Sequence, residues 1–162
     1  SRRTANGSKI FYVLIMEICN SILSNCDSSE EVDTISLSYE ERLMRRKKLV
    51  SDKGHEFLVD LEEMKSVLSN QVFKLESGKL ITIKSKKENL IEIKSKDLNK
   101  LIWHIGNRHI PCQIEATRIL IQSDHIIEDM VRRLGGQTKS VIEQFNPEGG
   151  AYGLGRTHGH KH

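Results

Sequence analysis

The amino-acid sequence has 162 residues, of which 37% are hydrophobic and 5% aromatic. This length suits one ordinary domain or two small ones. Two small domains would each bury little apolar surface, so oligomerisation would add stability. The net charge of +3 is mild and does not by itself indicate a nucleic-acid or membrane partner.

No stretch has the features of a membrane span or of a secreted scaffold. The longest apolar run, residues 10–16, has seven residues, whereas a membrane-spanning helix needs about 20. The run also lacks the small-residue cleavage pattern of a signal peptide. The three cysteines, Cys19, Cys26 and Cys112, are odd in number and scattered, which argues against a disulfide framework and for a reducing interior. We therefore expect a cytoplasmic protein.

The first half of the chain is predicted to be mostly strand. A polar loop is expected over residues 20–31, and residues 61–68 have helical spacing but are too few to decide. Two β-hairpins are predicted from their turn residues. The first turn contains Asp52 and Gly54, and the second contains Gly78. The predicted strand segments are residues 10–18, 47–50, 55–60, 72–75 and 79–84, and residues 34–38 alternate weakly.

Two charged stretches interrupt this pattern. The basic run is interpreted as a solvated face, because no aromatic residues interleave it to stack nucleic-acid bases. Its members are Arg42, Arg45, Arg46, Lys47 and Lys48. Residues 84–89 contain no apolar side chain and are the best candidate for a linker. This linker would separate a β-rich domain over 10–85 from a second domain over 86–150.

The second half follows the order β-α-β-β-α-β, which predicts a ferredoxin-like domain in an α+β chain. Asp97 and Asp124 are suited to start the two helices, and Gly106 and the pair at 135–136 to end them in left-handed geometry. Leu98, Leu101, Ile102 and Ile105 form the apolar stripe of the first helix. The expected segments are strands 90–94, 112–115, 118–122 and 138–145, and helices 97–106 and 124–134.

His109 is predicted to lie on the short connection between the first helix and the next strand, because Pro111 prevents further helix. Such a position is exposed enough for a ligand and rigid enough to aim an imidazole. The alternative is a helix terminus whose last carbonyls are met by Arg108 or by a charged His109.

The Gly- and His-rich tail over residues 151–162 is expected to be mobile. His158, His160 and His162 alternate, so in an extended chain their side chains point the same way and can converge on one ion. Such tracts are typical of metal binding, and imidazole suits zinc, copper, nickel and iron. An affinity tag is the alternative, although a designed tag is usually an uninterrupted run.

Other residue patterns give weaker evidence for a functional site. His125, at the start of the second helix, is either a ligand or a partly exposed first-turn residue. His104 lies about one turn before His109, either on a similar side of the helix or over apolar surface beside Trp103. The sequence has no zinc-finger cysteine pair, no glycine-flanked nucleophile and no phosphate-binding glycine loop.

The small number of available ligands predicts a metal site shared between two copies of the chain. One imidazole holds a transition metal poorly, whereas residues near a two-fold axis meet their own symmetry mates. A symmetric dimer would therefore bring two copies of His109 together, and tail histidines would complete the coordination. Such an open site suits transient carriage of a metal better than structure or hydrolysis. Affinity should fall below about pH 6 as imidazoles become protonated.

These pieces together resemble the UreE urease accessory proteins, the nickel metallochaperones of urease maturation. The matching stretches are residues 37–42, 51–60, the Gly-Asn-Arg-His motif within 106–111, 124–130 and 145–153 with the histidine tail. The resemblance implies a partner-binding β-rich domain, a ferredoxin-like metal-binding domain and a homodimer.

The resemblance also implies a ligand set and partners. His109 would bind nickel beside its symmetry mate, assisted by His158, His160 and His162. Members with a second metal site use a histidine at the position of His125 and another two positions earlier, where this chain has Ser123. The implied function is delivery of nickel to apo-urease, without a catalysed reaction. The implied partners are urease and the other accessory proteins, including the GTPase.

Two other functions compete with this interpretation. A general buffer or store for zinc, copper or nickel would use the same imidazoles, and ligand-field preference alone favours copper. A nucleic-acid-binding ferredoxin-like module would display stacking aromatics on its sheet, whereas these strands offer mainly aliphatic and charged residues.

Overall fold

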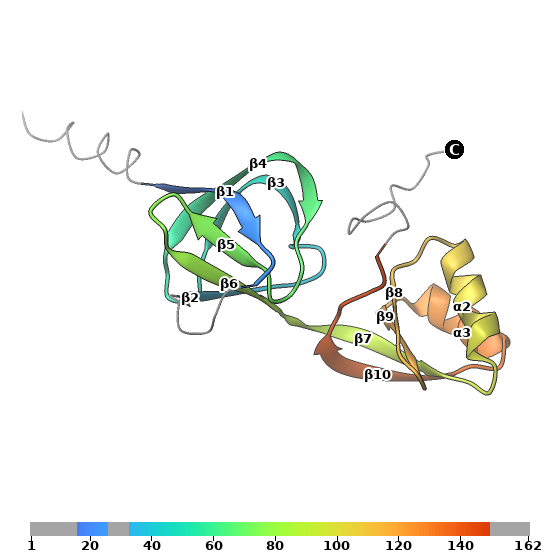
Figure 1. The fold of residues 1–162 in the computed structure, drawn as a ribbon. Helices are drawn as coiled ribbons and strands as arrows, with labels where there is room; N and C mark the ends of the chain where they lie inside the picture. Colours follow the sequence, from blue (N-terminus) through green and yellow to red (C-terminus); the bar gives the residue numbers. More distant parts are fainter. Residues whose placement is uncertain (1–15, 26–32, 150–162) are drawn as a thin grey trace, which may run out of the picture. The chain divides into compact units, whose positions relative to one another are not determined.

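The computed structural model describes residues 16–25 and 33–149. Within these ranges the chain divides into two compact units (Figure 1). The first unit contains Leu43–Lys84 together with the described residues before position 37. The second unit contains Leu37–Arg42 and the described residues from Ser85 onward. A short segment from the first half of the sequence therefore packs with the second half.

The first unit is built on one six-stranded sheet with the order β2-β6-β5-β1-β4-β3. Alternation along β4 explains its core: Phe57, Val59 and Leu61 are buried, whereas Glu56 and Asp60 are exposed. The strands are β1 (Glu17–Leu23), β2 (Asp33–Leu37), β3 (Leu43–Val50), β4 (Glu56–Ser66), β5 (Val72–Leu75) and β6 (Leu80–Ser85).

Both predicted hairpins are confirmed. The turn between β3 and β4 places Gly54 at φ +85°, and the turn between β5 and β6 places Gly78 at φ +90°. These left-handed conformations favour glycine because it has no Cβ. The N–H of Gly54 donates to the carbonyl of Ser51 over 2.9 Å, which closes the first turn.

One expectation for the first unit was wrong, and one stretch that the sequence left undecided is strand. The polar stretch beginning at Asn20 is not loop at its start, because β1 continues to Leu23 and pairs with β5 across a register shift between Cys19 and Ser21. Residues 61–66 are strand, since β4 stays paired with β3 as far as Ser66. Of the strand expected over 10–18, only Glu17 and Ile18 are strand among the described positions, and residues 10–15 lie outside them.

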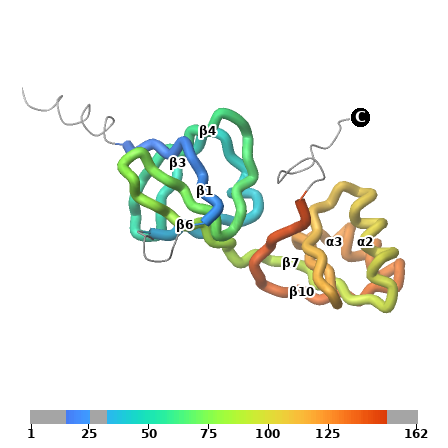
Figure 2. The backbone as a smooth tube through the Cα atoms, viewed as in Figure 1, coloured from blue at the N-terminus to red at the C-terminus, as the bar shows by residue number. Residues whose placement is uncertain are grey.

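The second unit confirms the predicted β-α-β-β-α-β order and the α+β class (Figures 1 and 2). Its antiparallel sheet has the order β10-β7-β9-β8. The elements are β7 (Lys87–Lys94), α2 (Leu98–Asn107), β8 (Cys112–Ile114), β9 (Ile119–Gln122), α3 (His125–Arg133) and β10 (Gln137–Gln144). The charged stretch over 84–89 is almost entirely strand, because β6 ends at Ser85 and β7 begins at Lys87.

Both helices pack on one face of this sheet. Leu101 and Ile105 from α2 and Ile127 and Val131 from α3 share one core cluster with sheet residues such as Ile93. As predicted, Asp97 accepts from the N–H of Lys100, and Asp124 accepts from the first N–H groups of α3. These caps satisfy donors that have no partner inside the helix.

The two helices end differently from one another. Gly135, at φ +86°, ends α3 as expected. Gly106 does not end α2 in left-handed geometry, which corrects the sequence expectation, because it remains within the helix. The left-handed residue after α2 is His109, with φ +57°.

The opposite face of the sheet holds a second, smaller cluster of buried residues. It comprises Tyr39, Leu90, Leu120 and Phe145, and the Tyr39 and Phe145 rings meet edge to face with centroids 5.4 Å apart. Arg42 is 3% exposed on this side. The expectation that it belongs to a solvated basic face is therefore wrong for Arg42, whereas Arg45, Arg46 and Lys48 are exposed.

Candidate metal centre

His109 lies on an anchored turn with its side chain exposed. Its N–H donates to the carbonyl of Gly106 over 3.0 Å, and the N–H of Ile110 donates to the carbonyl of Ile105 over 3.4 Å. Ile105 and Ile110 pack into the helix-side core. A left-handed conformation costs a non-glycine residue roughly 1–2 kcal/mol, and histidine is among the residues that adopt it more often. The core thus fixes the turn that presents the imidazole.

His104 lies beside Trp103 and is half-buried. The two rings meet edge to face with centroids 5.0 Å apart, so of the two positions considered for His104 the structure shows the one over apolar surface. The indole itself is 64% exposed. Its exposure was not predicted from the sequence, although Trp103 lies off the apolar stripe of α2, and this offset is the signal that would have found it.

His125 is the first residue of α3 and is exposed. The neighbouring Asp124 carboxylate accepts from the N–H groups of Ile126 and Ile127 at 2.9 and 3.2 Å, so it is engaged in capping the helix. Within residues 16–25 and 33–149, no three histidine, cysteine, aspartate or glutamate side chains are placed to hold one metal ion. The described part of one chain does not join His109 and His125 in a three-donor site.

The tail histidines His158, His160 and His162 lie outside the described residues. The chain just before the tail, however, returns to the start of β8. The N–H of Glu148 donates to the carbonyl of Cys112 over 2.9 Å, and the N–H of Asn146 donates to Oε1 of Gln113 over 2.8 Å. The described chain thus ends beside the start of β8 (Figure 1). Cys112 follows His109 by three positions in the sequence. Sequence reasoning missed this contact because no local pattern signals it.

The two cysteines in the described part of the chain do not provide further ligands. Cys19 and Cys112 are free and buried, and burial raises the pKa of both thiols. The metal ligand is the thiolate, so a raised pKa disfavours metal binding. Imidazole is therefore favoured over thiolate as the donor near the His109 turn.

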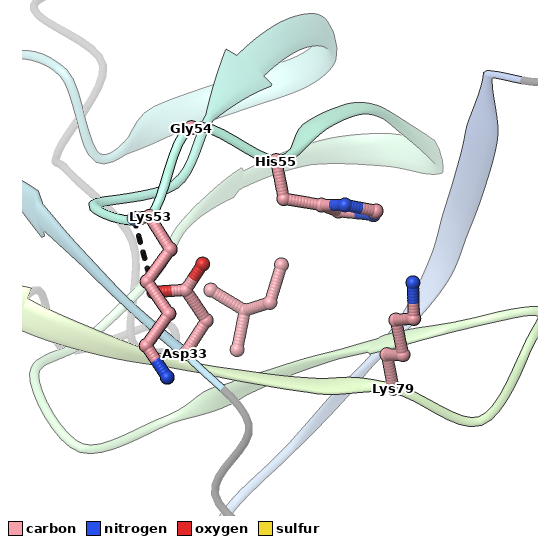
Figure 3. Close-up of a pocket in the computed structure, with 6 residues that line it drawn as sticks. Asp33, Lys53, Gly54, His55 and Lys79 are labelled. Carbon is pink, nitrogen blue, oxygen red and sulfur yellow. Dashed lines mark hydrogen bonds between the residues drawn. The ribbon is translucent and has the colours of Figure 1, made fainter.

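The first unit contains a cavity of about 290 Å³, shown in Figure 3. His55 Nε2 and Lys79 Nζ lie 3.1 and 3.4 Å from the carboxylate of Glu17. Burial opposes ionisation of Glu17, but hydrogen bonds from His55 and Ser77 and the charge of Lys79 outweigh it and lower its pKa. The cavity is lined by Asp33, Lys53, Gly54, His55, Lys79 and Ile81.

Asp33, which also lines this cavity, is hydrogen-bonded to neighbouring residues. Its carboxylate accepts from the hydroxyl of Ser51 and from the N–H groups of Thr34 and Lys53. These hydrogen bonds outweigh the effect of burial and lower the pKa of Asp33. The cavity therefore has a structural explanation, and the His109 turn is the stronger candidate site.

None of the described helices is both long and apolar enough to cross a membrane.

Comparison with known proteins identifies the family. The model of the UreE urease accessory protein N-terminal domain matches residues 20–86, and that of the C-terminal domain matches residues 88–162. The chain belongs to the UreE urease accessory protein family. The resemblance inferred from the sequence is thereby confirmed, and the His109 turn, α3 and the histidine tail all fall within the match to the C-terminal UreE domain.

Individual UreE proteins match most of the chain. The urease accessory protein UreE of Ruegeria pomeroyi is 49% identical over 144 residues, which cover 89% of this chain and 97% of the relative. UreE of Rhodobacter capsulatus is 48% identical over 134 residues, covering 83% and 85%. UreE of Paracoccus denitrificans is 43% identical over 136 residues, covering 84% and 86%.

Proposed function

We propose that this UreE family member is a nickel metallochaperone that delivers nickel to apo-urease while the urease active site is assembled. The observation that carries the proposal is an exposed His109 on an anchored turn, in a chain whose described residues form no three-donor metal group. A single imidazole holds nickel weakly, so the tight site needs His109 from a second copy of the chain. Nickel bound in this way is cargo.

Exposed apolar side chains on the two helices support a homodimer. Trp103 of α2 and Ile126 of α3 are each 64% exposed, and α2 leads directly into the His109 turn. Exposed tryptophan rings are enriched at protein interfaces. Burying this part of α2 against a second copy near a two-fold axis would bring the two His109 turns together.

The tail histidines are proposed as supplementary ligands. The hydrogen bond between Glu148 and Cys112 fixes the chain near His109. His158 is nine positions beyond Gly149, a separation that spans at most about 30 Å when the chain is extended. His158, His160 and His162 are therefore within reach of an ion at His109. His125 is proposed as a further, weaker ligand, since the position two residues earlier holds Ser123.

The remaining parts of the proposal concern partners and compartment. Residues 10–85 would bind partner proteins, and residues 86–150 with the tail would carry the metal. The partners of the protein would be urease and the other urease accessory proteins, including the GTPase. Neither nucleic acid nor a membrane would be involved, and no reaction would be catalysed. A cytoplasmic location is supported by the free thiols of Cys19 and Cys112.

Nickel titration by calorimetry tests the site. We expect His109→Asn and His109→Ala each to abolish the tight site, whereas truncation after Tyr152 lowers affinity or stoichiometry and leaves the dimer intact. His55→Ala is the matched control, because His55 pairs with Glu17 in the other unit. Tight nickel binding that survived both His109 variants would contradict the assignment.

A second measurement separates delivery from storage. Nickel-loaded protein is mixed with apo-urease in the presence of a nickel chelator and the other accessory proteins, and urease activity is followed. A chaperone activates urease under these conditions, whereas a general zinc, copper or nickel buffer loses its nickel to the chelator. Competition with zinc and copper in the same titrations reports how far the site itself discriminates between metals.

A further inference from the structure

The strand β3 lies at one edge of the sheet in the first unit. Among the described residues its neighbour in the sheet is β4, with which it pairs in antiparallel register (Figure 1). An edge strand turns half of its backbone N–H and C=O groups away from that neighbour, where another strand can pair with them. At one end, the N–H of Asp52 donates to the carbonyl of Thr34 over 2.8 Å, so the free part of the edge begins at Val50.

The register shows which residues of β3 turn their backbone groups towards the free edge. The N–H of Ser51 donates to the carbonyl of His55 over 2.9 Å, so these two residues form a hydrogen-bonded pair. Hydrogen-bonded and non-hydrogen-bonded pairs alternate along an antiparallel ladder. In the register of β3 with β4, Val50, Lys48 and Arg46 therefore direct their N–H and C=O groups away from β4.

The side chains of the same three residues lie on one face of the sheet. Residues two positions apart in a strand point to the same side. Arg46, Lys48 and Val50 are all exposed, whereas Leu49 between them is buried in the core. The free edge thus presents two cations and one apolar side chain in a row, next to outward-facing backbone groups.

Acidic residues of β4 flank the two cations on one side. Asp60 lies opposite Arg46 in the register, and the carboxylate of Glu56 lies 3.3 Å from Nζ of Lys48. The side chains of Lys48 and Glu56 are each more than half exposed, so this pair is weak and Lys48 stays accessible to a second carboxylate. A strand added at the free edge with acidic residues would place each cation between two carboxylates.

The charge of β3 selects the kind of strand that fits there. Its sequence, LMRRKKLV, contains four cationic residues and no acidic one. Two copies of β3 would bring like charges face to face, which is unfavourable, whereas carboxylates would be attracted. Nucleic acid would also meet positive charge, but β3 has no aromatic side chain on which bases could stack. The edge therefore favours an acidic polypeptide over a second copy or a nucleic acid.

We propose that the free edge of β3 binds an acidic, extended segment of a partner protein by strand addition. The backbone of the segment pairs with Arg46, Lys48 and Val50, its carboxylates lie beside the two cations, and an apolar residue lies beside Val50. This inference rests on the proposed function in one respect, the assignment of partner binding to the first unit. It adds the surface and the chemistry of the partner.

A synthetic peptide tests whether binding uses the backbone. The probe is an end-capped, fluorescently labelled peptide, Val-Thr-Glu-Thr-Glu-Thr-Glu-Thr-Val, whose glutamates and valines share one face of a strand. One derivative is N-methylated at the three glutamates and another at three of the threonines. Each derivative loses hydrogen bonding along one of its two edges and keeps its charges. Binding to the full-length protein is followed by fluorescence anisotropy at about 0.15 M salt, where distant charges are screened.

We expect the parent peptide to bind, and one set of N-methyl groups to abolish binding while the other set leaves it unchanged. The glutamate amides are the required set if the peptide runs antiparallel to β3, and the threonine amides if it runs parallel. No binding of the parent peptide, or equal effects of the two sets, would overturn strand addition. This comparison uses the unaltered protein and so does not depend on the folding of a variant.

Charge reversal tests the role of the two cations. Arg46→Glu combined with Lys48→Glu should lower affinity for the peptide roughly tenfold, because two attractive cross-strand pairs become repulsive. Val50→Ser should lower it by a smaller factor. Lys74→Glu combined with Lys84→Glu is the matched control, with the same net charge and two exposed lysines on the inner strands β5 and β6. An equal loss in both double variants would mean unspecific attraction and overturn the proposal.

Two further measurements identify a different occupant. A single-stranded oligonucleotide that binds more tightly than the peptide and is lost in the Arg46→Glu, Lys48→Glu protein would make the edge a nucleic-acid site. A dimer that dissociates in the same variant would make it a contact between copies. Either result overturns the proposal. Nickel affinity of this variant should be unchanged, because His109 belongs to the other unit. Tight nickel binding that survives His109→Asn refutes the nickel site and leaves the peptide result standing, whereas absent peptide binding refutes only the β3 edge.

Discussion

The backbone N–H of His109 donates to the carbonyl oxygen of Gly106, 3.0 Å away, and the histidine, not the glycine, adopts the left-handed conformation. Gly106 stays helical, and a Cβ built there would meet nothing within 4 Å. The turn that presents the candidate ligand therefore does not depend on glycine at position 106. It depends on the packing of Ile105 and Ile110 into the core.

Gly106→Ala is expected to stabilise the protein by about 0.5–1 kcal/mol, because alanine loses less conformational entropy in a helix. Gly136→Ala is the contrasting variant. A Cβ at Gly136 would lie 2.5 Å from Cγ1 of Val131 and 3.0 Å from Cδ1 of Leu101, and such overpacking typically costs about 1–3 kcal/mol. Urea unfolding followed by circular dichroism measures both changes. A destabilised Gly106→Ala would mean that position 106 needs a left-handed residue after all.

Nickel affinity is expected to fall steeply on acidification. Ordinary imidazole side chains take up protons around pH 6.5, and a protonated imidazole cannot bind nickel. Each imidazole that must be deprotonated lowers affinity by up to about tenfold per pH unit below that range, so two His109 side chains give up to about a hundredfold. The fluorescence of Trp103, the single tryptophan of the chain, is a convenient reporter in α2. Affinity that stayed constant between pH 7.5 and about 5 would exclude an imidazole site.

Arg118 is expected to make stability depend on pH. Its guanidinium lies 2.8 Å from the carboxylates of both Glu92 and Glu143, and hydrogen bonds from Arg118 lower the pKa of each. The folded state therefore binds fewer protons than the unfolded chain in the window just below the unfolded pKa of about 4.3. The resulting stabilisation is present above that pKa and is lost as the pH falls through the lowered folded values.

Arg118→Gln should accordingly unfold at a lower urea concentration at pH 7, and its difference from the parent protein should shrink as the pH falls from about 5 towards 3. Urea midpoints across this range measure the effect. Lys48→Gln is the control, because Lys48 and Glu56 form an exposed surface pair at 3.3 Å and such pairs contribute little. A deficit for Arg118→Gln that was independent of pH would mean that the charge pairing does not stabilise the fold.

Local chemistry in the sequence was sufficient for the element order of the second unit. The signals were periodic apolar residues, the capping residues Asp97 and Asp124, and Gly135. Each acts on residues a few positions away, so its effect can be predicted without a structure. The same holds for the hairpin turns at Gly54 and Gly78, and for the placement of His109 between a helix and a strand.

Tertiary structure decided the features that depend on distant partners. Ser21 looks like a loop residue, yet it pairs with Lys74 of β5 and is part of a strand. Arg42 looks like part of a solvated basic run, yet Ser85 and Asn146 bury it. Which residue took the left-handed turn, and where the histidine tail leaves the domain, followed from side chains that meet only after folding. Sequence periodicity reports each residue's own preference, whereas these outcomes were set by partners many residues away.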